Sequence, residues 1–289
     1  MAAQLHAPWP YFGGKRSIAH RVWELFGDVD HYIEPFAGGA AVLLGRPRGH
    51  AGDVETLNDA DGLVTNAWRA IRYAPGPLAV RIRALPISEL DLHARNLALR
   101  GRREGLVTSL RQDPYFFDLE AAAWWVHGQC AWTGGGWCRL DSPRRPKLSR
   151  PGLGAGSRSG RASLPDDLAN LAARLQDVRI CCGDWGRVVT PDALSCGGKD
   201  ASIGIFLDPP YSHDMRDAQI YGVEMSDAGE VAAWAHRTCV RDPRVRVVLC
   251  GLWGEHDMPG WTQEVWRDDG ETLWCSPSCF APTQVGLWS

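Results

Sequence analysis

An acid, two prolines and a tyrosine directly follow a short apolar run in the stretch IGIFLDPPY. The run predicts a buried strand over residues 203–207, since apolar segments of this length between chain breakers are typical of sheet interiors. The strand must end before Asp208 because Pro209 and Pro210 cannot donate hydrogen bonds to a sheet. Asp208, both prolines and Tyr211 then lie at the carboxyl end of a strand, where open α/β sheets bind ligands. The stretch therefore predicts a ligand-binding or catalytic site at the end of this strand.

A glycine pair follows another predicted strand in DHYIEPFAGGAAVLL, residues 30–44. The strand covers Tyr32 and Ile33, and the chain then passes through Gly38 and Gly39 into a helix of small residues. Such glycines allow a ligand to approach the backbone closely beneath a helix N-terminus. Glycine turns also occur in α/β folds for structural reasons, so this motif alone leaves both interpretations open.

Acidic residues follow the next predicted strand in TLNDADGLVTNAW, residues 56–68. Asp59, with Asn58 beside it, is placed to accept hydrogen bonds from the ribose hydroxyls of a nucleoside, as acids at the end of the second strand of a doubly wound sheet do. Alternatively, Asp59 or Asp61 caps the following helix. Both roles are compatible because neighbouring acids can divide them.

Two further loops carry candidate ligand contacts. In PYFGGKRS, residues 10–17, Lys15 is a cation that suits a ligand carboxylate, although the segment alone is more typical of a solvated turn. In CCGDWGRVV, residues 181–189, Asp184 can accept from an exocyclic purine amine and Trp185 can stack on the ring. In isolation that pair is more typical of a helix cap followed by a core tryptophan.

The elements that position these residues are arranged in three blocks. Residues 1–85 and 171–289 alternate strand and helix patterns, whereas residues 86–170 contain a Trp-rich helical stretch, a glycine tip and a basic run. Alternation, interruption and resumption predict one α/β sheet with an inserted, mainly helical module.

The first helix has a clear amphipathic pattern in RSIAHRVWELFG. Ile18, Val22 and Leu25 lie one helical turn apart, as a helix with one buried face requires. Ser17 before the pattern and Gly27 after it are typical helix start and stop residues.

The composition of the chain limits the possible functions. The net charge of −3 does not indicate a nucleic-acid-binding protein, so such a role has to depend on local basic clusters. No apolar run reaches membrane-spanning length and the first residues lack a signal-peptide pattern, so we expect a soluble, intracellular protein. The nine cysteines include no CxxC pair, which favours reduced, mostly buried thiols over a zinc site.

The order of the motifs is far more specific than any one of them. GGK, EPFAGG, an ND acid, GDW and finally DPPY, in that order, resemble the Dam-like class of DNA adenine methyltransferases. The resemblance implies a Rossmann-like S-adenosylmethionine-dependent methyltransferase sheet with an inserted, mainly helical target recognition module over residues 86–170. It also implies transfer of a methyl group from S-adenosylmethionine to the exocyclic amine of adenine in double-stranded DNA.

The resemblance assigns roles to individual residues. Four would form the catalytic motif: Asp208, Pro209, Pro210 and Tyr211. The cofactor contacts would be Tyr11, Lys15, Glu34, Pro35, Phe36, Ala37, Gly38, Gly39, Asn58, Asp59, Asp184, Trp185 and Asp208. No metal is implied. The family often has a glycine where this chain has Ala40, and the extra methyl group is expected to narrow the approach to the cofactor.

The residue types of DPPY fit this chemistry independently. Adenine's exocyclic nitrogen is a poor nucleophile because its lone pair is delocalised into the ring. Asp208 accepting one N–H and the Pro209 carbonyl accepting the other favour a pyramidal nitrogen with its lone pair directed at the methyl group. Tyr211 offers a face on which the flipped base can stack. The chemistry needs no covalent intermediate and no nucleophilic cysteine.

We expect the DNA contacts to come from the middle block. The run RLDSPRRPKLSRPGLGAGSRSGR, residues 139–161, holds seven basic residues and one acid between flexible glycines, prolines and serines. Its composition is also that of a solvated linker. On a mildly acidic protein it is nevertheless the obvious phosphate-binding element. The candidate DNA contacts are Arg139, Arg144, Arg145, Lys147 and Arg150.

Other functions remain open at this stage. A cytosine-N4 methyltransferase needs the same acceptor geometry but more often has Ser in place of the leading Asp of DPPY. A DNA-binding protein that keeps the fold without activity is a second alternative. The sequence motif EPFAGGA is not the GxGxxG turn of dinucleotide-binding oxidoreductases. We expect a cytoplasmic, nucleoid-associated enzyme of a bacterium or phage-infected cell, without an obligate protein partner and with or without a restriction endonuclease.

Overall fold

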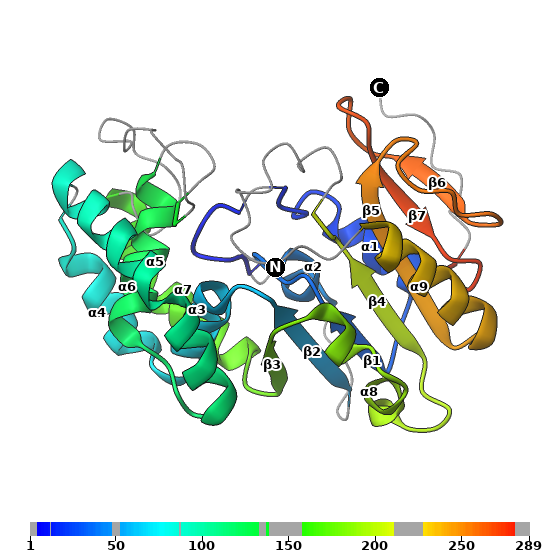
Figure 1. Cartoon of the computed structure of the whole chain (residues 1–289), viewed down its shortest axis with the longest axis horizontal. Coiled ribbons are helices and arrows are strands. Elements are labelled where there is room, and N and C mark those ends of the chain that lie inside the picture. Colours follow the sequence, from blue (N-terminus) through cyan, green and yellow to red (C-terminus); the bar gives the residue numbers. More distant parts are fainter. Residues whose placement is uncertain are drawn as a thin grey trace.

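A seven-stranded sheet forms the centre of the protein (Figure 1). The computed structural model describes residues 5–11, 13–47, 53–86, 88–132, 137–138, 158–210 and 228–280. The strand order is β3-β2-β1-β4-β5-β7-β6. The strands are β1 (His31–Glu34), β2 (Val54–Asp59), β3 (Val178–Cys182), β4 (Ile203–Leu207), β5 (Val245–Leu252), β6 (Thr262–Val265) and β7 (Glu271–Cys275). This confirms the predicted α/β fold class.

The first five strands run parallel, and β7 pairs antiparallel with both β5 and β6. β1 lies in the middle of the sheet, with His31 opposite Val54 of β2 on one side and Ile203 of β4 on the other. Every residue of β1 and β4 is buried, as expected for parallel strands that are covered on both faces. Parallel strands end at the same edge, so the segments after β1, β2, β3, β4 and β5 are neighbours there.

Helices cover both faces of the sheet, α9 on one face and α1 on the other (Figure 1). Ile205 and Leu207 of β4 belong to the core that α9 shares, whereas Phe206 belongs to the core that α1 shares. This alternation fixes the direction of the side chains at the end of β4. The elements around the sheet are α1 (Ala19–Phe26), α2 (Ala41–Leu44), α3 (Gly62–Tyr73), the 3₁₀ helices η1 (Trp185–Val188) and η2 (Ser195–Gly197), α8 (Pro191–Leu194) and α9 (Ala228–Arg241).

The prediction for the first helix was correct for its buried face and wrong for its start. Ile18, Val22 and Leu25 are all buried, and Gly27 ends the helix in a left-handed conformation with φ +60°. The residue before the first helical turn is Ile18, which has no capping side chain, so Ser17 is not the cap. Burial of Ile18 and its neighbours therefore sets where this helix begins.

Four further helices lie to one side of the sheet, at the left of Figure 1. They are α4 (Pro75–Ala84), α5 (Glu89–Gln112), α6 (Leu119–Ala131) and α7 (Arg158–Arg174). Asp118 caps α6 by accepting from the Ala121 N–H at 2.9 Å. Trp125 of α6 is buried and meets Trp9 edge-on at 5.0 Å between ring centroids. Truncating such a buried indole typically costs about 3–5 kcal/mol of stability, so Trp125 anchors this group.

The nine cysteines are free thiols, four of them buried and one, Cys196, exposed. Burial raises the pKa of several of these thiols, and it raises that of Cys239 to about 12. None of the helices in the described residues is both long and apolar enough to cross a membrane. In the same described ranges, no group of three or more His, Cys, Asp or Glu side chains is arranged to hold a metal ion.

Candidate active site

Asp208 follows the last residue of β4, at the carboxyl edge of the sheet, as predicted. Lys15 places its ammonium 2.9 Å from Oδ1 of Asp208 and also donates to the Gly13 carbonyl at 2.7 Å. The lysine side chain is 4% exposed and the aspartate side chain 22% exposed. Two segments almost two hundred residues apart therefore meet in one nearly buried ion pair.

The ion pair determines the charge state of Lys15. Burial alone would lower the pKa of the ammonium, but the Asp208 carboxylate raises that pKa above its ordinary value. Lys15 is thus a permanent cation next to Asp208. The sequence analysis assigned Lys15 to a cofactor carboxylate. In the structure Lys15 contacts a carboxylate of the protein, that of Asp208.

The side chain of Glu34, at the end of β1, forms hydrogen bonds within the protein. Oε2 accepts from the Tyr32 hydroxyl at 2.9 Å and from the Leu43 N–H at 3.0 Å. Burial raises the pKa of this carboxyl to about 8, against the effect of these hydrogen bonds, and the nearby Asp208 charge raises it further. Glu34 therefore connects β1 to helix α2 and fixes the loop that carries the glycine pair.

Asp59, at the end of β2, also forms a hydrogen bond with the loop that carries the glycine pair. Oδ2 accepts from the Gly38 N–H at 2.9 Å and Oδ1 from the Asp61 N–H at 2.8 Å. Burial, then the neighbouring Asp61, raises the pKa of Asp59 to about 7. Asp61 caps α3 by accepting from the Leu63 N–H at 2.9 Å, so the helix-cap role falls to Asp61 rather than Asp59.

Asn58 joins three of the loops at this edge. Its amide donates to the Pro35 carbonyl at 3.0 Å and to the Gly183 carbonyl at 2.9 Å, and its own backbone carbonyl accepts from the Ala37 N–H at 2.9 Å. The side chain is buried and its Oδ1 has no hydrogen-bond partner in the described residues. The predicted cofactor residue Asn58 is thus also the crosslink between the ends of β1, β2 and β3.

Tyr11 packs against the glycine pair. A Cβ added to Gly38, which has φ +47°, would lie 2.5 Å from Cε1 of Tyr11. Only a residue without a side chain allows this contact. Gly39 is less crowded, because a Cβ there would lie 3.4 Å from the nearest Tyr11 atom. The sequence analysis explained the glycine pair by the close approach of a ligand. The structure adds a second reason for glycine at position 38, which is the contact with the Tyr11 ring.

Ala40 adopts a left-handed conformation with φ 49° and ψ 38°. Most residues pay for this conformation in steric strain, and glycine does not. The Ala40 side chain is fully buried in the core shared with α1 and does not face the solvent-accessible edge. The alanine therefore strains the backbone at this turn, and a narrower approach to the cofactor stays a prediction.

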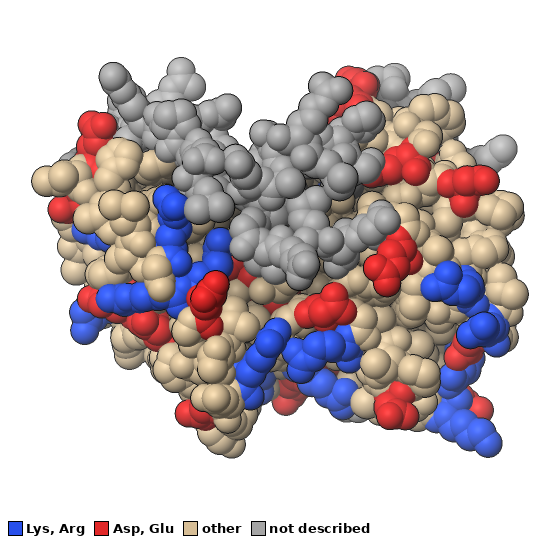
Figure 2. All heavy atoms as spheres, viewed as in Figure 1, with Lys and Arg blue, Asp and Glu red and all other residues tan. Residues whose placement is uncertain are grey.

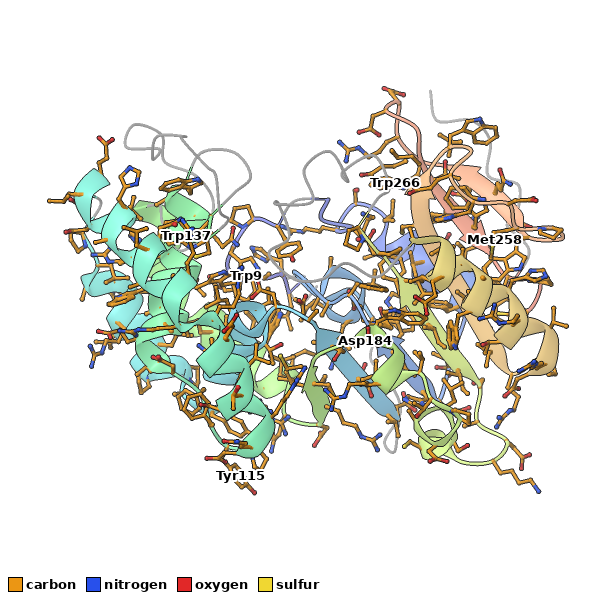
Figure 3. The ribbon with its side chains drawn as sticks, in the orientation of Figure 1. Trp9, Tyr115, Trp137, Asp184, Met258 and Trp266 are labelled. Carbon is orange, nitrogen blue, oxygen red and sulfur yellow. The ribbon has the colours of Figure 1, made fainter. Side chains whose placement is uncertain are left out.

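Asp184 and Trp185 follow β3, and both of their predicted structural roles are present. Asp184, labelled in Figure 3, is exposed and accepts from the Gly186 N–H at 2.8 Å, capping η1. Trp185 is buried, stacks on Phe36 at 6.2 Å between centroids and meets Trp234 edge-on at 5.4 Å. Phe36 is only half-buried, as Trp234 is, so it keeps open surface for a planar ligand.

Several predicted residues lie outside the part of the chain that the structure describes. These are Tyr211 and the candidate DNA contacts Arg139, Arg144, Arg145, Lys147 and Arg150. Pro209 is buried and Pro210 half-buried directly after Asp208. On the face shown in Figure 2, Lys and Arg side chains gather over the helical side and along the lower middle, whereas acidic side chains are more frequent towards the β5–β7 side.

Sequence reasoning missed the pairing of Lys15 with Asp208. One signal was available: Lys15 is one of three lysines in a chain with 31 Lys and Arg residues. An ammonium is a compact point charge, whereas a guanidinium is a broad fork. The compact ammonium suits the confined position of Lys15, although rarity alone does not identify such a position, since Lys199 is exposed.

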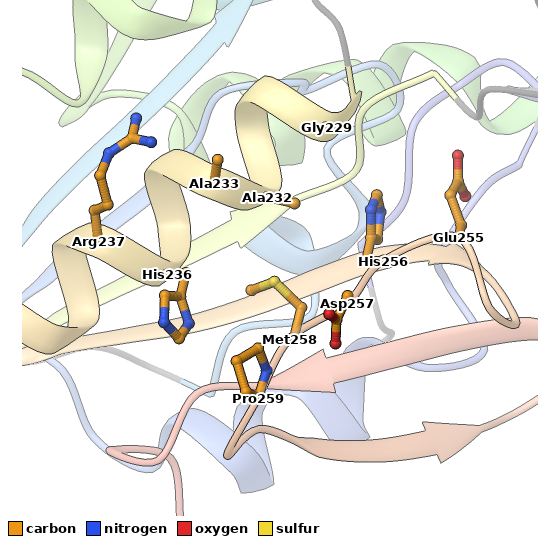
Figure 4. Close-up of a pocket in the computed structure, with 10 residues that line it drawn as sticks. All are labelled: Gly229, Ala232, Ala233, His236, Arg237, Glu255, His256, Asp257, Met258 and Pro259. Carbon is orange, nitrogen blue, oxygen red and sulfur yellow. The ribbon is translucent and has the colours of Figure 1, made fainter.

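A shallow pocket of about 400 Å³ lies elsewhere, between α9 and the loop after β5 (Figure 4). His236 of α9 lines one side, and His256, Asp257 and Met258 line the other. Met258 belongs to the core that α9 shares, which is on the face of the sheet opposite to Asp208 and Lys15. None of the predicted site residues lines this pocket.

Comparison with known proteins agrees with this geometry. Residues 11–98 match the family of D12 class N6 adenine-specific DNA methyltransferases. The match covers Tyr11, Lys15, the glycine pair and Asp59, and it ends before Asp184 and Asp208. No curated protein gives a significant match to the chain. The α/β sheet is consistent with a Rossmann-like methyltransferase, and the matched family uses a methyl donor of the S-adenosylmethionine type. Over residues 11–98 the chain is thus similar to the D12 class N6 adenine-specific DNA methyltransferases.

Proposed function

We propose that Asp208 and the Pro209 carbonyl bind the exocyclic amine of a flipped adenine in double-stranded DNA. The observation that supports this is the Lys15–Asp208 ion pair at the end of β4, next to the three joined loops. Lys15 keeps the Asp208 carboxylate ionised, so it can accept an N–H. The carbonyl of Pro209 is the second acceptor, and Pro209 and Pro210 restrict the backbone that carries it.

The two acceptors act on the amine in the same way. Each acceptor polarises one N–H bond and favours a pyramidal nitrogen. The nitrogen lone pair is then less delocalised into the ring and can act as the nucleophile. The bound donor would supply the methyl group and keep the electron pair of its broken sulfur–carbon bond. The amine nitrogen would then carry a positive charge and give up one proton. The nearby Asp208 oxygen accepts that proton and passes it to solvent. Tyr211 stacks on the flipped base.

The edge of the sheet fits S-adenosylmethionine, which supplies the methyl group when bound. Each Asp59 oxygen accepts one backbone N–H and keeps acceptor capacity for a ribose hydroxyl. The buried Asn58 Oδ1 has no partner in the described residues, so it suits a donor group at this edge. Phe36 offers a half-open aromatic face, and Asp184 offers an exposed carboxylate. Tyr11 packs against Gly38 in the glycine loop at this edge.

The DNA duplex is proposed to bind between the sheet edge and the helices α4–α7, with residues 86–170 as the target recognition module. The helices follow β2 and precede β3 in the sequence, so their group is inserted between two adjacent strands. The basic run 139–161 supplies the phosphate contacts in this proposal. The cytosine-N4 and inactive DNA-binding alternatives gain no support from the family match.

The test is a comparison of Asp208→Ala with Asp200→Ala, an exposed acid just before the same strand. Asp208→Ala should lower methyl transfer to adenine-containing duplexes at least about 100-fold, the size expected for loss of one key electrostatic contact. S-adenosylmethionine binding, measured by calorimetry, should stay within a few-fold, and Asp200→Ala should be normal in both assays. Retained turnover by Asp208→Ala would refute the assignment.

A further inference from the structure

A second buried carboxylate, Glu271 of β7, lies beside the Lys15–Asp208 pair. Leu273 and Cys275 of β7 join the core on the α1 face, whereas Trp274 joins the core on the α9 face. By the same alternation Glu271 points to the α1 face. Cys250 of β5 also points there and pairs with Leu273, one side-chain step from Glu271.

The strand register places these groups on neighbouring strands. Leu207 of β4 lies opposite Leu249 of β5, so Asp208 and Cys250 are the next neighbours along the two strands. Leu252 of β5 lies opposite Glu271 of β7. Asp208, Cys250 and Glu271 therefore occupy one face of three adjacent strands at their shared edge. Neighbouring strands are about 4.8 Å apart and Glu271 is two residues along β7 from the partner of Cys250, so the backbones of Glu271 and Asp208 are on the order of 12 Å apart, with Lys15 on the same face.

The charged groups around Glu271 do not neutralise it fully. The residue is 7% exposed, and its Oε2 has no hydrogen-bond partner in the described residues. The Arg267 guanidinium is 3.6 Å from Oε2 but is about half exposed to solvent. Burial raises the pKa of Glu271, the Lys15 and Arg267 charges lower it, and Asp208 and Asp269 raise it. Lys15 is thus the buried cation in reach of both carboxylates.

We propose that Glu271 is a positioning residue that shares the Lys15 cation with Asp208. This inference depends on the proposed function. When Asp208 accepts the proton from the methylated nitrogen, its negative charge disappears and Lys15 loses its nearest counter-charge. A buried cation without a counter-charge is costly. Glu271 supplies the remaining negative charge, so Asp208 can take up the proton without leaving Lys15 unbalanced.

A double-mutant cycle on equilibrium unfolding tests this without using activity. With Lys15 present, Glu271→Gln should lower the unfolding midpoint, because the cation loses a counter-charge. In the Lys15→Met background the same change should raise the midpoint, because it removes a buried carboxylate that has lost its cation. Additive effects would overturn the proposal. Glu264→Gln on β6 is the matched control, since its partner is Arg21 at 2.9 Å, and it should be additive with Lys15→Met.

The design also covers variants that do not fold. If Glu271→Gln is unfolded and Lys15→Met restores folding, the rescue supports the shared charge. If the double variant is less stable than Lys15→Met alone, the proposal is overturned, because removing a carboxylate that has lost its cation should not destabilise the protein.

The pH–rate profile of methyl transfer gives the second measurement. Glu271→Gln removes a negative neighbour of Asp208, so Asp208 stays ionised at lower pH. The acid limb of the profile should move down by up to about one pH unit, and the plateau rate should fall. A purely structural role would lower the rate equally at every pH. Normal turnover of Asp208→Ala would sink the proposed function itself, whereas an unmoved acid limb in Glu271→Gln would sink only this inference.

Discussion

Replacing Lys15 by Met should have two separable effects, one on stability and one on the pH range of activity. At 2.9 Å, two unit charges attract each other by about 6 kcal/mol at an effective dielectric constant of about 20. Desolvation of the buried ammonium offsets part of this. Removing one partner of a fully buried pair costs about 3–5 kcal/mol. Because the Asp208 side chain is 22% exposed, water recovers part of that loss, and we expect about 2–4 kcal/mol.

The effect on activity follows from the sign of the lost charge. Without the cation, the ionised form of Asp208 is less favourable, so activity is lost at a higher pH on the acid side. A loss of about 2 kcal/mol corresponds to roughly 1.5 pH units, since one unit is about 1.4 kcal/mol. Urea unfolding and a pH–rate profile of methyl transfer measure the two effects.

The control for Lys15→Met is Lys199→Met, since Lys199 is exposed. It should change neither the urea midpoint nor the acid limb. A Lys15→Met enzyme whose acid limb coincides with that of wild type would show that the ion pair does not set the charge of Asp208, and the reasoning would then be refuted even if stability falls.

Three further predictions concern the loops and the sheet. Gly38→Ala should cost about 2 kcal/mol or more in urea unfolding, because its Cβ would lie 2.5 Å from the Tyr11 ring and its φ is positive, whereas Gly39→Ala should cost less than about 1 kcal/mol; equal losses would contradict this. Burial, followed by the Arg179 charge, lowers the pKa of His31 to about 4, so stability should be lost as pH falls from 6.5 to 4, by up to about 3 kcal/mol. His31→Phe should flatten that dependence in thermal unfolding at pH 7 and pH 4.5, and an unchanged slope would exclude His31 as its source. Asp59→Ala should weaken S-adenosylmethionine binding by about 2–4 kcal/mol in calorimetry, and an unchanged affinity would leave Asp59 with only its backbone contacts.

The strands and helices could be predicted because their signals are local. The apolar run before DPPY predicts residues 203–207, and β4 has those bounds. The strand predicted at Tyr32 and Ile33 is present and one residue longer at each end. The buried face of α1 follows from three apolar residues one turn apart. The start of α1 was wrong because capping depends on backbone geometry and burial as well as on residue type.

The contacts of the site could not be predicted because they are not local. Lys15 and Asp208 are far apart in the sequence, and only the position of β4 in the sheet brings them together. The two hydrogen bonds of Asn58 need the carbonyls of Pro35 and Gly183 to point to one place, which no pattern of residue types reports. The sequence located the residues at the edge of the sheet but not which of them bind one another.

The position of β1 has a consequence for how the protein is synthesised. β1 pairs with β2 and β4, and β4 begins 169 positions after β1 ends. At about 5–20 residues per second, the ribosome needs on the order of ten seconds or more to deliver β4. During that time one edge of a strand that is buried in the folded protein stays unpaired in the nascent chain, and unpaired edges recruit other strands. The helices α3–α6 can form early from local contacts, whereas the ion pair of Asp208 with Lys15 forms only after most of the chain has emerged. Slower translation or chaperone binding should therefore affect the yield of this enzyme more than that of a helical protein of equal length.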